Sequence, residues 1–321
     1  MQLLNSDLEE NTTIVRPAYF ISGFTDIPNI KYYYVFLSLL YIISVLGNTV
    51  VMVIICLDHT LRTPKYVAVF NLAFADLLSS SALVPKVLDI FLFDHPYISY
   101  DDCFTFMFFC YAFLSMQPLN LVALSYDRLI AVGFPLHYQV KVTHRGMFSL
   151  IVFFWLFVII VTLFAVSLPT RISFCMSVVN SFFCDYILML AFVCNDNILS
   201  MVIDHLISVL SLWLPLLFIL SCYSYIGYAL SKVAAVQERV KAFKTCTSHL
   251  SLVAIYFLPI MITFANIDPN ARLINMSLTA VFPSTLNPII YVLQTQEIKV
   301  SVKRLLKIRK RSRITVKRII I

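Results

Sequence analysis

The sequence predicts an all-α membrane protein, a bundle of seven transmembrane helices followed by a short amphipathic helix. Composition is the first reason, because 60% of the 321 residues are hydrophobic and only 13% are charged. Soluble domains are nearer half apolar and a quarter charged. The second reason is that the apolar residues form seven continuous runs, each long enough to cross a bilayer, which takes about 20 residues.

The seven runs are expected to be helices, because lipid offers no partner to the backbone N–H and C=O groups of a spanning segment. A membrane barrel would instead show alternating segments of about ten residues. The predicted spans are Tyr33–Leu57, Val67–Leu92, Phe104–Tyr126, Met147–Leu168, Ile198–Leu230, Cys246–Ile267 and Met276–Leu293.

The segment before the first span does not have the pattern of a cleavable signal peptide. It carries Asp7, Glu9 and Glu10 ahead of any apolar run, whereas a signal peptide has a basic start and then a short apolar stretch. The first span is therefore expected to act as an uncleaved signal anchor. The expected domains are an extracellular N-terminal tail over 1–31, the bundle over 32–294, and a cytoplasmic amphipathic helix with a basic tail over 295–321.

The basic residues predict the orientation of the bundle. With the N-terminus outside, 19 of the 24 Lys and Arg residues fall on the cytoplasmic side, as the positive-inside rule requires. The net charge of +7 is then explained by attraction to anionic inner-leaflet lipid. Nucleic-acid binding is excluded as an interpretation of that charge, because the sequence contains no soluble basic domain.

Four of the eight cysteines fall on the predicted outer side, where disulfides persist. They are Cys103, Cys175, Cys184 and Cys194, and the residues alone leave all three pairings open. Asn11 begins a glycosylation sequon on the outer tail. A second sequon begins at Asn275, close to the predicted membrane surface.

Ionisable side chains within a span are candidate functional residues, because each costs about 2.5–3.5 kcal/mol at the bilayer centre. Asp76 is expected to be a hydrogen-bond hub to Asn48 and Asn287, an ion or proton site that changes between two states, or both. Asp127 and Arg128 end the third span. They form either an interfacial charge pair or a lock that opens when a partner docks.

Charged side chains also lie at the outer ends of the second and fifth spans. They are Lys86, Asp89, Asp204 and His205. Each either reaches toward the headgroups or faces a central pocket and meets a polar ligand.

Prolines interrupt several spans, and each frees backbone carbonyls and bends its helix. They are Pro118, Pro215, Pro259, Pro283 and Pro288. The bends in the last three spans are either hinges of a two-state bundle or static kinks.

Several different short motifs are distributed along nearly the whole chain. They are Gly47-Asn48, Asn71–Asp76, Trp155 and Asn287–Tyr291, and then Leu61–Tyr66, Ser125–Arg128, Pro135–Tyr138, Lys241–Leu250 and Phe182–Asp185. The first four resemble rhodopsin-like G protein-coupled receptors, and the others resemble the odorant receptors within that class. The Lys241–Leu250 motif is the most specific of them. Pro259 resembles the fish-like subfamily, while Leu129, Gly133 and Phe134 depart from the family pattern.

The resemblance implies two disulfides, Cys103–Cys184 and Cys175–Cys194. It also implies an odorant pocket in the outer half of the bundle, between the third, fifth, sixth and seventh spans. The residues expected to line it are Tyr111, Leu114, Ser115, Asp204, His205, Ile260, Met261 and Phe264. Helical spacing supports those on the third and sixth spans, although the same spacing is typical of ordinary helix packing.

The resemblance further implies that ligand binding activates a heterotrimeric G protein, expected to be stimulatory and to act through cyclic AMP. The residues expected to couple or switch are Asp76, Asp127, Arg128, Tyr225, Lys244, Asn287, Pro288 and Tyr291. Tyr223 is the alternative to Tyr225 for the tyrosine of the fifth span. No catalytic residue, cofactor or metal is expected.

The expected location is the plasma membrane, and by resemblance the ciliary membrane of olfactory neurons. One alternative is a non-olfactory receptor of the same class, for a polar metabolite, an amine or a peptide. A transporter is the other, but transporters tend to show inverted repeats and paired broken helices, and this sequence shows neither.

Overall fold

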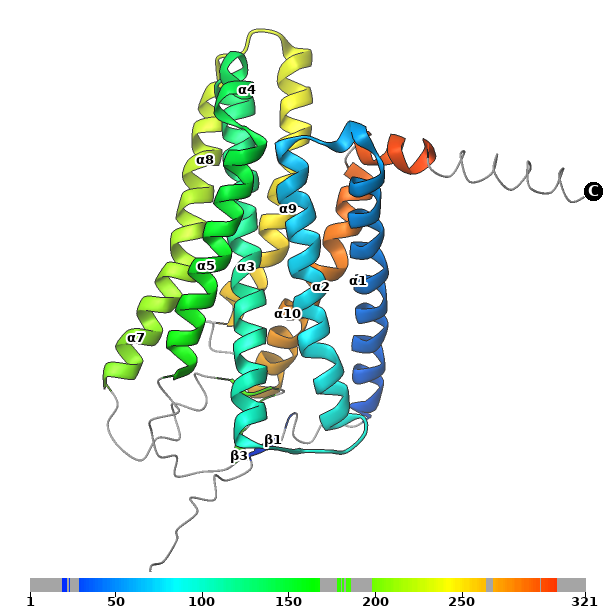
Figure 1. Ribbon diagram of the computed structural model, residues 1–321, viewed down its shortest axis with the longest axis vertical. Coiled ribbons are helices and arrows are strands. Elements are labelled where there is room, and N and C mark those ends of the chain that lie inside the picture. The colour runs from blue at the N-terminus through cyan, green and yellow to red at the C-terminus, as the bar shows by residue number, and fades with distance from the viewer. Residues whose placement is uncertain are drawn as a thin grey trace, which may run out of the picture.

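The protein is a bundle of long helices that stand side by side (Figure 1). The computed structural model describes residues 19–21, 23, 29–167, 178–179, 181, 183–185, 198–263, 268–294 and 296–304. Among these residues, seven helices are long and apolar enough to cross a membrane. The predicted fold class is therefore confirmed.

The spanning helices follow the predicted runs. They are α1 (Lys31–Leu57), α2 (Pro64–Phe91), α3 (Tyr100–Gly133), α5 (His144–Ser167), a fifth helix made of α7 (Ile198–Ser208), η4 (Val209–Trp213) and α8 (Leu214–Ser231), then α9 (Val236–Thr263) and α10 (Pro269–Gln294). The last two begin before their apolar runs do, because a helix continues into polar residues beyond the lipid. Asp268 caps α10, since its carboxylate accepts from the backbone N–H groups of Asn270 at 2.9 Å and Ala271 at 3.2 Å.

A small sheet covers one end of the bundle. Strand β1 (Tyr19–Ile21) pairs antiparallel with β2 (Tyr97–Ile98) and parallel with β3 (Val178–Val179). The disulfide between Cys103 and Cys184 lies at the same end, where α3 begins. We call this the disulfide end; it is the lower end in Figure 1.

The opposite end, which we call the Arg128 end, carries the short helical turns. They are η1 (His59–Leu61), η2 (Pro135–His137), α4 (Tyr138–Lys141) and a helix over 296–304. The expected helix after the seventh span is thus present. Its Ile298 is fully buried and its Val302 packs against the main core of the bundle.

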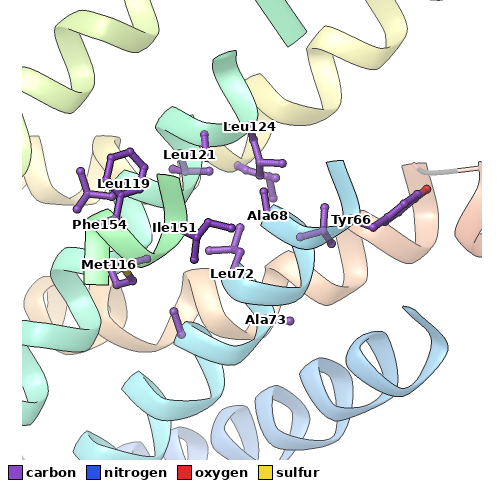
Figure 2. Packing of buried hydrophobic residues seen from close by; sticks show 14 of the residues in the cluster. Tyr66, Ala68, Leu72, Ala73, Met116, Leu119, Leu121, Leu124, Ile151 and Phe154 are labelled. Carbon is purple, nitrogen blue, oxygen red and sulfur yellow. The ribbon is translucent and has the colours of Figure 1, made fainter. Parts of the chain in front are cut away.

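The main hydrophobic core lies where α2, α3 and α5 meet (Figure 2). The labelled side chains of this cluster are Tyr66, Ala68, Leu72, Ala73, Met116, Leu119, Leu121, Leu124, Ile151 and Phe154. α2 and α3 bury the largest share of their spans, and α5 and the fifth helix bury the smallest. The exposed apolar faces of α1, α5 and α8 are suited to contact with lipid.

Polar side chains link the helices inside this core. The Trp155 indole N–H donates to Asn71 Oδ1 at 2.9 Å, and Asn71 Nδ2 donates to Asn120 Oδ1 at 2.6 Å. Because hydrocarbon offers polar groups no other partner, such bonds fix the relative rotation of neighbouring helices. α5, α2 and α3 are held in register in this way.

Candidate functional site

A cavity of about 110 Å³ lies in the half of the bundle nearer the disulfide end, between α3, α5 and the fifth helix. Its lining residues are Met107, Tyr111, Ser115, Leu119, Phe157, Val158, Val161, Thr162, Ala165, Val166, Ile207, Ser208 and Ser211. The wall is mostly apolar, with hydroxyl groups from all three helices. None of these lining residues is charged.

The fifth helix contributes hydroxyls to the cavity through a local break in its regular winding. Residues Val209–Trp213 form a π-helical turn just before Pro215, and such turns are frequent at functional sites. Ser208 directly precedes this turn and Ser211 lies within it, and both line the cavity. Ser211 donates to the Ile207 carbonyl at 2.7 Å.

The residues predicted to bind ligand are not all brought to this cavity. Tyr111 and Ser115 line it. Leu114 does not, and its carbonyl instead accepts the hydroxyl of Tyr256 at 3.2 Å. His205 lies exposed on α7.

The predicted lining residues of α9 also lie elsewhere. Ile260 and Met261 are half-buried on α9 without lining this cavity. The side chain of Asp204, and the whole of Phe264, lie outside the described residues. The expectation of walls from the sixth and seventh spans does not match this cavity, because α9 packs directly onto α3 through Tyr256.

α5 supplies the wall that the sequence interpretation missed. Phe157, Val158 and Thr162 of α5 all line the cavity. Thr162 is the one polar side chain among the buried residues of α5, and a threonine inside this apolar run is the signal that the sequence offers. The family resemblance implies a pocket between the third, fifth, sixth and seventh spans, a set that does not include α5.

The charged residues at the disulfide end of α2 pair with one another rather than with the cavity. Lys86 Nζ lies 2.9 Å from Asp89 Oδ2, and His95 Nδ1 lies 2.9 Å from Asp89 Oδ1. None of the three lines the cavity. Neither Lys86 nor Asp89 therefore contributes to this cavity.

A polar cluster surrounds the buried carboxylate of Asp76, near the middle of α2. Its Oδ1 accepts from Gln117 Nε2 at 3.0 Å and its Oδ2 accepts from Asn287 Nδ2 at 2.7 Å. The expected bond from Asn48 is a wrong prediction: Asn48 Nδ2 donates to the Ser284 carbonyl at 2.8 Å. Asp76 therefore connects α2 to α3 and α10, while Asn48 connects α1 to α10.

A second cavity, of about 330 Å³, opens at the Arg128 end. Its lining residues are Lys65, Tyr66, Val69, Leu124, Arg128, Lys244, Ser248, His249, Leu252, Ile290, Tyr291, Gln296 and Glu297. Three of them are basic and only Glu297 is acidic, so the cavity is positively charged. Arg128, Lys244 and Tyr291 are predicted coupling residues, and all three are found here.

Arg128 is held in place by its neighbour Asp127, with which it forms an ion pair. Asp127 is fully buried and also accepts the hydroxyl of Tyr138 in α4 at 2.7 Å. Burial raises the pKa of Tyr138, and the Asp127 carboxylate raises it further. Tyr138 therefore keeps its proton and donates it to this bond.

The fifth-helix tyrosine that faces α9 is Tyr223, not the predicted Tyr225. The Tyr223 hydroxyl lies 2.7 Å from His249 Nδ1 and the two rings stack. Tyr225 points away, is 41% exposed, and stacks on Phe134. Two positions along a helix differ by about 200°, so only one of the pair can face the bundle interior.

Pro288 and Tyr291 complete the predicted coupling set on α10. A Cβ added at Gly47 would lie 2.8 Å from Pro288 Cγ, so glycine allows α1 and α10 to approach closely here. The Tyr291 hydroxyl is buried and makes no hydrogen bond within the described structure.

The remaining sequence predictions have mixed outcomes. The Cys103–Cys184 disulfide is present, while Cys175, Cys194 and Asn11 lie outside the described residues. Asn275 is half-buried within α10, and its side-chain amide donates to the Pro259 carbonyl at 2.7 Å. In the described part of the chain, no group of three or more His, Cys, Asp or Glu side chains could hold a metal ion.

Known proteins resemble this chain along most of its length. A family model described as olfactory receptor matches residues 37–309. Olfactory receptor 1 of Rattus norvegicus is 34% identical over 280 residues, which cover 85% of this chain and 88% of that protein. Olfactory receptor 2AP1 of Homo sapiens is 31% identical over 307 residues, which cover 93% of this chain and 98% of that protein.

A solved structure resembles the fold. The crystal structure of squid rhodopsin matches with a TM-score of 0.73 and 19% sequence identity, covering 88% of this chain and 87% of that one. At this identity the match supports the seven-helix architecture alone.

Proposed function

The chain belongs to the olfactory receptor family, and we propose that it binds a small odorant between α3, α5 and the fifth helix and then activates a heterotrimeric G protein at the Arg128 end. As a member of this family it is a multi-pass plasma-membrane receptor and not an enzyme. The observation that carries the proposal is the pair of cavities, one neutral and nearer the disulfide end, the other basic and at the Arg128 end.

The neutral cavity supports the ligand half of the proposal. Small-molecule sites are mostly apolar cavities with a few well-placed polar groups. Here the hydroxyl-bearing residues Tyr111, Ser115, Thr162 and Ser208 stand among apolar side chains. Because no charged side chain lines this cavity, it suits an uncharged odorant that carries one or two oxygen atoms.

The basic cavity supports the coupling half of the proposal. Lys65, Arg128 and Lys244 surround an apolar floor that includes Leu124 and Leu252. An amphipathic helix with an acidic end would match both the charge and the apolar floor. The G protein is expected to provide this helix and, by resemblance, to be of the stimulatory type that raises cyclic AMP.

Activation requires a rearrangement that both cavities share. Asp127 forms an ion pair with the Arg128 guanidinium. A docking partner must therefore compete with Asp127 for Arg128. A ligand can favour the open form only through its higher affinity for that form. The polar cluster at Asp76 contacts α2, α3 and α10, and it provides the connection between the two ends.

We further place the disulfide end outside the cell and the Arg128 end in the cytoplasm, in the ciliary membrane of olfactory neurons. Two features favour this orientation. Disulfides persist on the oxidising side, and the excess of Lys and Arg falls toward the other side.

Cyclic AMP accumulation in cells that express the receptor with a stimulatory olfactory-type G protein tests the proposal. The ligands are matched sets with the same carbon skeleton, presented as alcohol, aldehyde, carboxylate and amine. We expect responses to the alcohol or aldehyde, lost in Arg128→Ala and retained in Arg145→Ala at equal surface expression. A well-expressed wild type that responds to none of these compounds would contradict the odorant assignment.

A further inference from the structure

A short helix over 296–304 lies across the Arg128 end and is tied to the turn between α1 and α2. It is the red coil beside the upper end of α1 in Figure 1. Three of its side chains, Glu297, Ser301 and Arg304, make the attachment. Their spacing of four and then three residues places them on one face of the helix.

Asp58 is the centre of this attachment. It caps η1 by accepting from the Thr60 backbone N–H at 3.0 Å and the Thr60 hydroxyl at 2.8 Å. Both of its oxygens also accept from Arg304 Nη1 at 3.0 Å. Hydrogen bonds from Ser301 and then Thr60 hold the pKa of Asp58 at about 2, so its carboxylate is charged at physiological pH.

Glu297 forms the second attachment point, one turn earlier in the helix. It accepts the Tyr66 hydroxyl at 3.3 Å and lies 3.6 Å from Lys65 Nζ. Glu297 and Lys65 also line the basic cavity. The seating of the 296–304 helix therefore sets part of the cavity wall and part of its charge.

Ser301 lies between these two points and is 1% exposed. Its hydroxyl reaches both the Glu297 carbonyl, at 2.9 Å, and the Asp58 carboxylate. Basic residues surround it in sequence, with Lys299 two positions before and Lys303 and Arg304 just after. A serine with basic residues on both sides is the kind of substrate that basophilic protein kinases accept.

We propose that Ser301 is a phosphorylation site for a basophilic serine/threonine kinase, and that its phosphate keeps the 296–304 helix off η1 and weakens coupling at the basic cavity. The Ser301 oxygen attacks the γ-phosphorus of ATP, the bond to the bridging oxygen of ADP breaks, and the hydroxyl proton passes to a base of the kinase. Only the effect on coupling rests on the proposed function; the modification and the release of the helix do not.

Charge and space both oppose the return of a phosphorylated helix. A phosphate adds about −1.5 to −2 charges and three acceptor oxygens. At Ser301 these would stand beside the buried carboxylate of Asp58 in a site that accommodates only a hydroxyl. The phosphate would also attract Arg304, three residues along the helix, away from Asp58.

The burial of Ser301 determines the order of events. A kinase cannot reach a side chain that is 1% exposed, so the helix must leave η1 first. Phosphorylation then traps the released form by removing it from the equilibrium. Release takes Glu297 away from Lys65, which alters the wall and the charge of the basic cavity.

The site is tested on the purified full-length receptor in lipid nanodiscs, with protein kinase C and ATP, followed by mass spectrometric site mapping. We expect phosphate on Ser301 in the wild type and none at this position in Ser301→Ala. Asp58→Asn loosens the attachment without touching the kinase recognition residues, so labelling should be several-fold faster. Asp94→Asn, the same change at an exposed position on the disulfide end, should label at the wild-type rate.

Hydrogen exchange of the 298–304 amides measures release of the helix without any ligand or G protein. We expect phosphorylation to speed this exchange roughly tenfold, because like charges would then face each other across the contact. The proposal is overturned if Asp58→Asn receptor takes no phosphate at Ser301. It is also overturned if phosphorylated receptor exchanges at the unmodified rate.

Nucleotide exchange on a purified stimulatory G protein measures the regulatory effect. We expect Ser301→Asp to reduce the rate roughly tenfold, whereas the neutral Ser301→Asn should change it less than twofold. If Ser301→Asp couples like wild type, the regulation is wrong and the proposed function stands. If the wild type itself drives no exchange, the G protein proposal fails, and the labelling and hydrogen exchange still decide the Ser301 site.

Discussion

The two cavities of the bundle differ in what builds them and in what they can bind. The cavity near the disulfide end is lined by apolar side chains and hydroxyls from α3, α5 and the fifth helix. The cavity at the Arg128 end is lined by α2, α3, α9, α10 and the 296–304 helix, and each of these except α10 supplies a charged side chain. The first recognises shape and a few hydrogen bonds, whereas the second recognises charge.

The comparison teaches that the two ends can vary independently. Substituting a hydroxyl-bearing residue of the first cavity should change which ligand binds, with little effect on the fold, because no buried charge depends on that hydroxyl. At the other end, the loss of Arg128 leaves the fully buried Asp127 without its ion-pair partner. Substitutions there are expected to affect stability and coupling together.

The largest effect is expected from Arg128→Ala, which should abolish G protein activation and also destabilise the receptor. Breaking a buried ion pair costs up to about 3–5 kcal/mol, and Asp127 would keep only its hydrogen bond from the Tyr138 hydroxyl. Nucleotide exchange and thermal unfolding in detergent measure the two effects. Arg145→Ala, at an exposed position, is the matched control, and equal effects in both variants would contradict a special role for Arg128.

Gln117→Leu should have the next largest effect, because it removes one of the two amide donors that serve Asp76. A buried acceptor that loses its donor costs about 1–3 kcal/mol. We expect a lower unfolding temperature whether or not a ligand is bound, because Asp76, Gln117 and Asn287 line neither cavity. Gln117→Glu, which keeps the shape but adds a like charge beside Asp76, should be less stable than wild type at neutral pH. Wild-type stability in Gln117→Leu would contradict this role of the cluster.

Thr162→Val should act on the disulfide-end cavity alone. It keeps the side-chain shape but removes a hydroxyl. The lost hydrogen bond to the ligand contributes about 1 kcal/mol, which corresponds to a loss of affinity of less than tenfold. The half-maximal concentration of an oxygen-bearing odorant should rise by that factor, while the response to the matching hydrocarbon should not change. Thr247→Val, whose hydroxyl only bonds its own helix on α9, is the control. The ligand site is misplaced if the two variants behave alike.

The smallest effect is expected from mild acid at the attachment of the 296–304 helix. The pKa of Asp58 falls from 3.8 to about 2, because Ser301 and Thr60 donate to its carboxylate. A lowered carboxyl pKa contributes stability that is complete above the unfolded value and is lost as pH falls through the folded value. The attachment should therefore stay closed between pH 7.5 and 5, with no change in corrected amide exchange over 298–304. Opening near pH 5 would show that a group other than Asp58 controls it.

The sequence alone determined the number of spans, their approximate bounds and the family. A membrane helix satisfies its backbone hydrogen bonds within its own segment, so each run of apolar residues predicts its own structure. The motifs at Lys241–Leu250 and Asn287–Tyr291 are equally local, and the family comparisons agree with them.

Only the tertiary structure decided which face of each helix looks inward and which helices meet. It placed Tyr223 rather than Tyr225 against His249, bonded Asn48 to Ser284 rather than to Asp76, and brought Thr162 of α5 to the ligand cavity. It also brought Asp58 into contact with Arg304, which lies 246 residues later in the chain. These outcomes depend on packing between segments far apart in the chain, where a rotation of one helix by about 100° exchanges one residue for its neighbour, and no local pattern specifies that rotation.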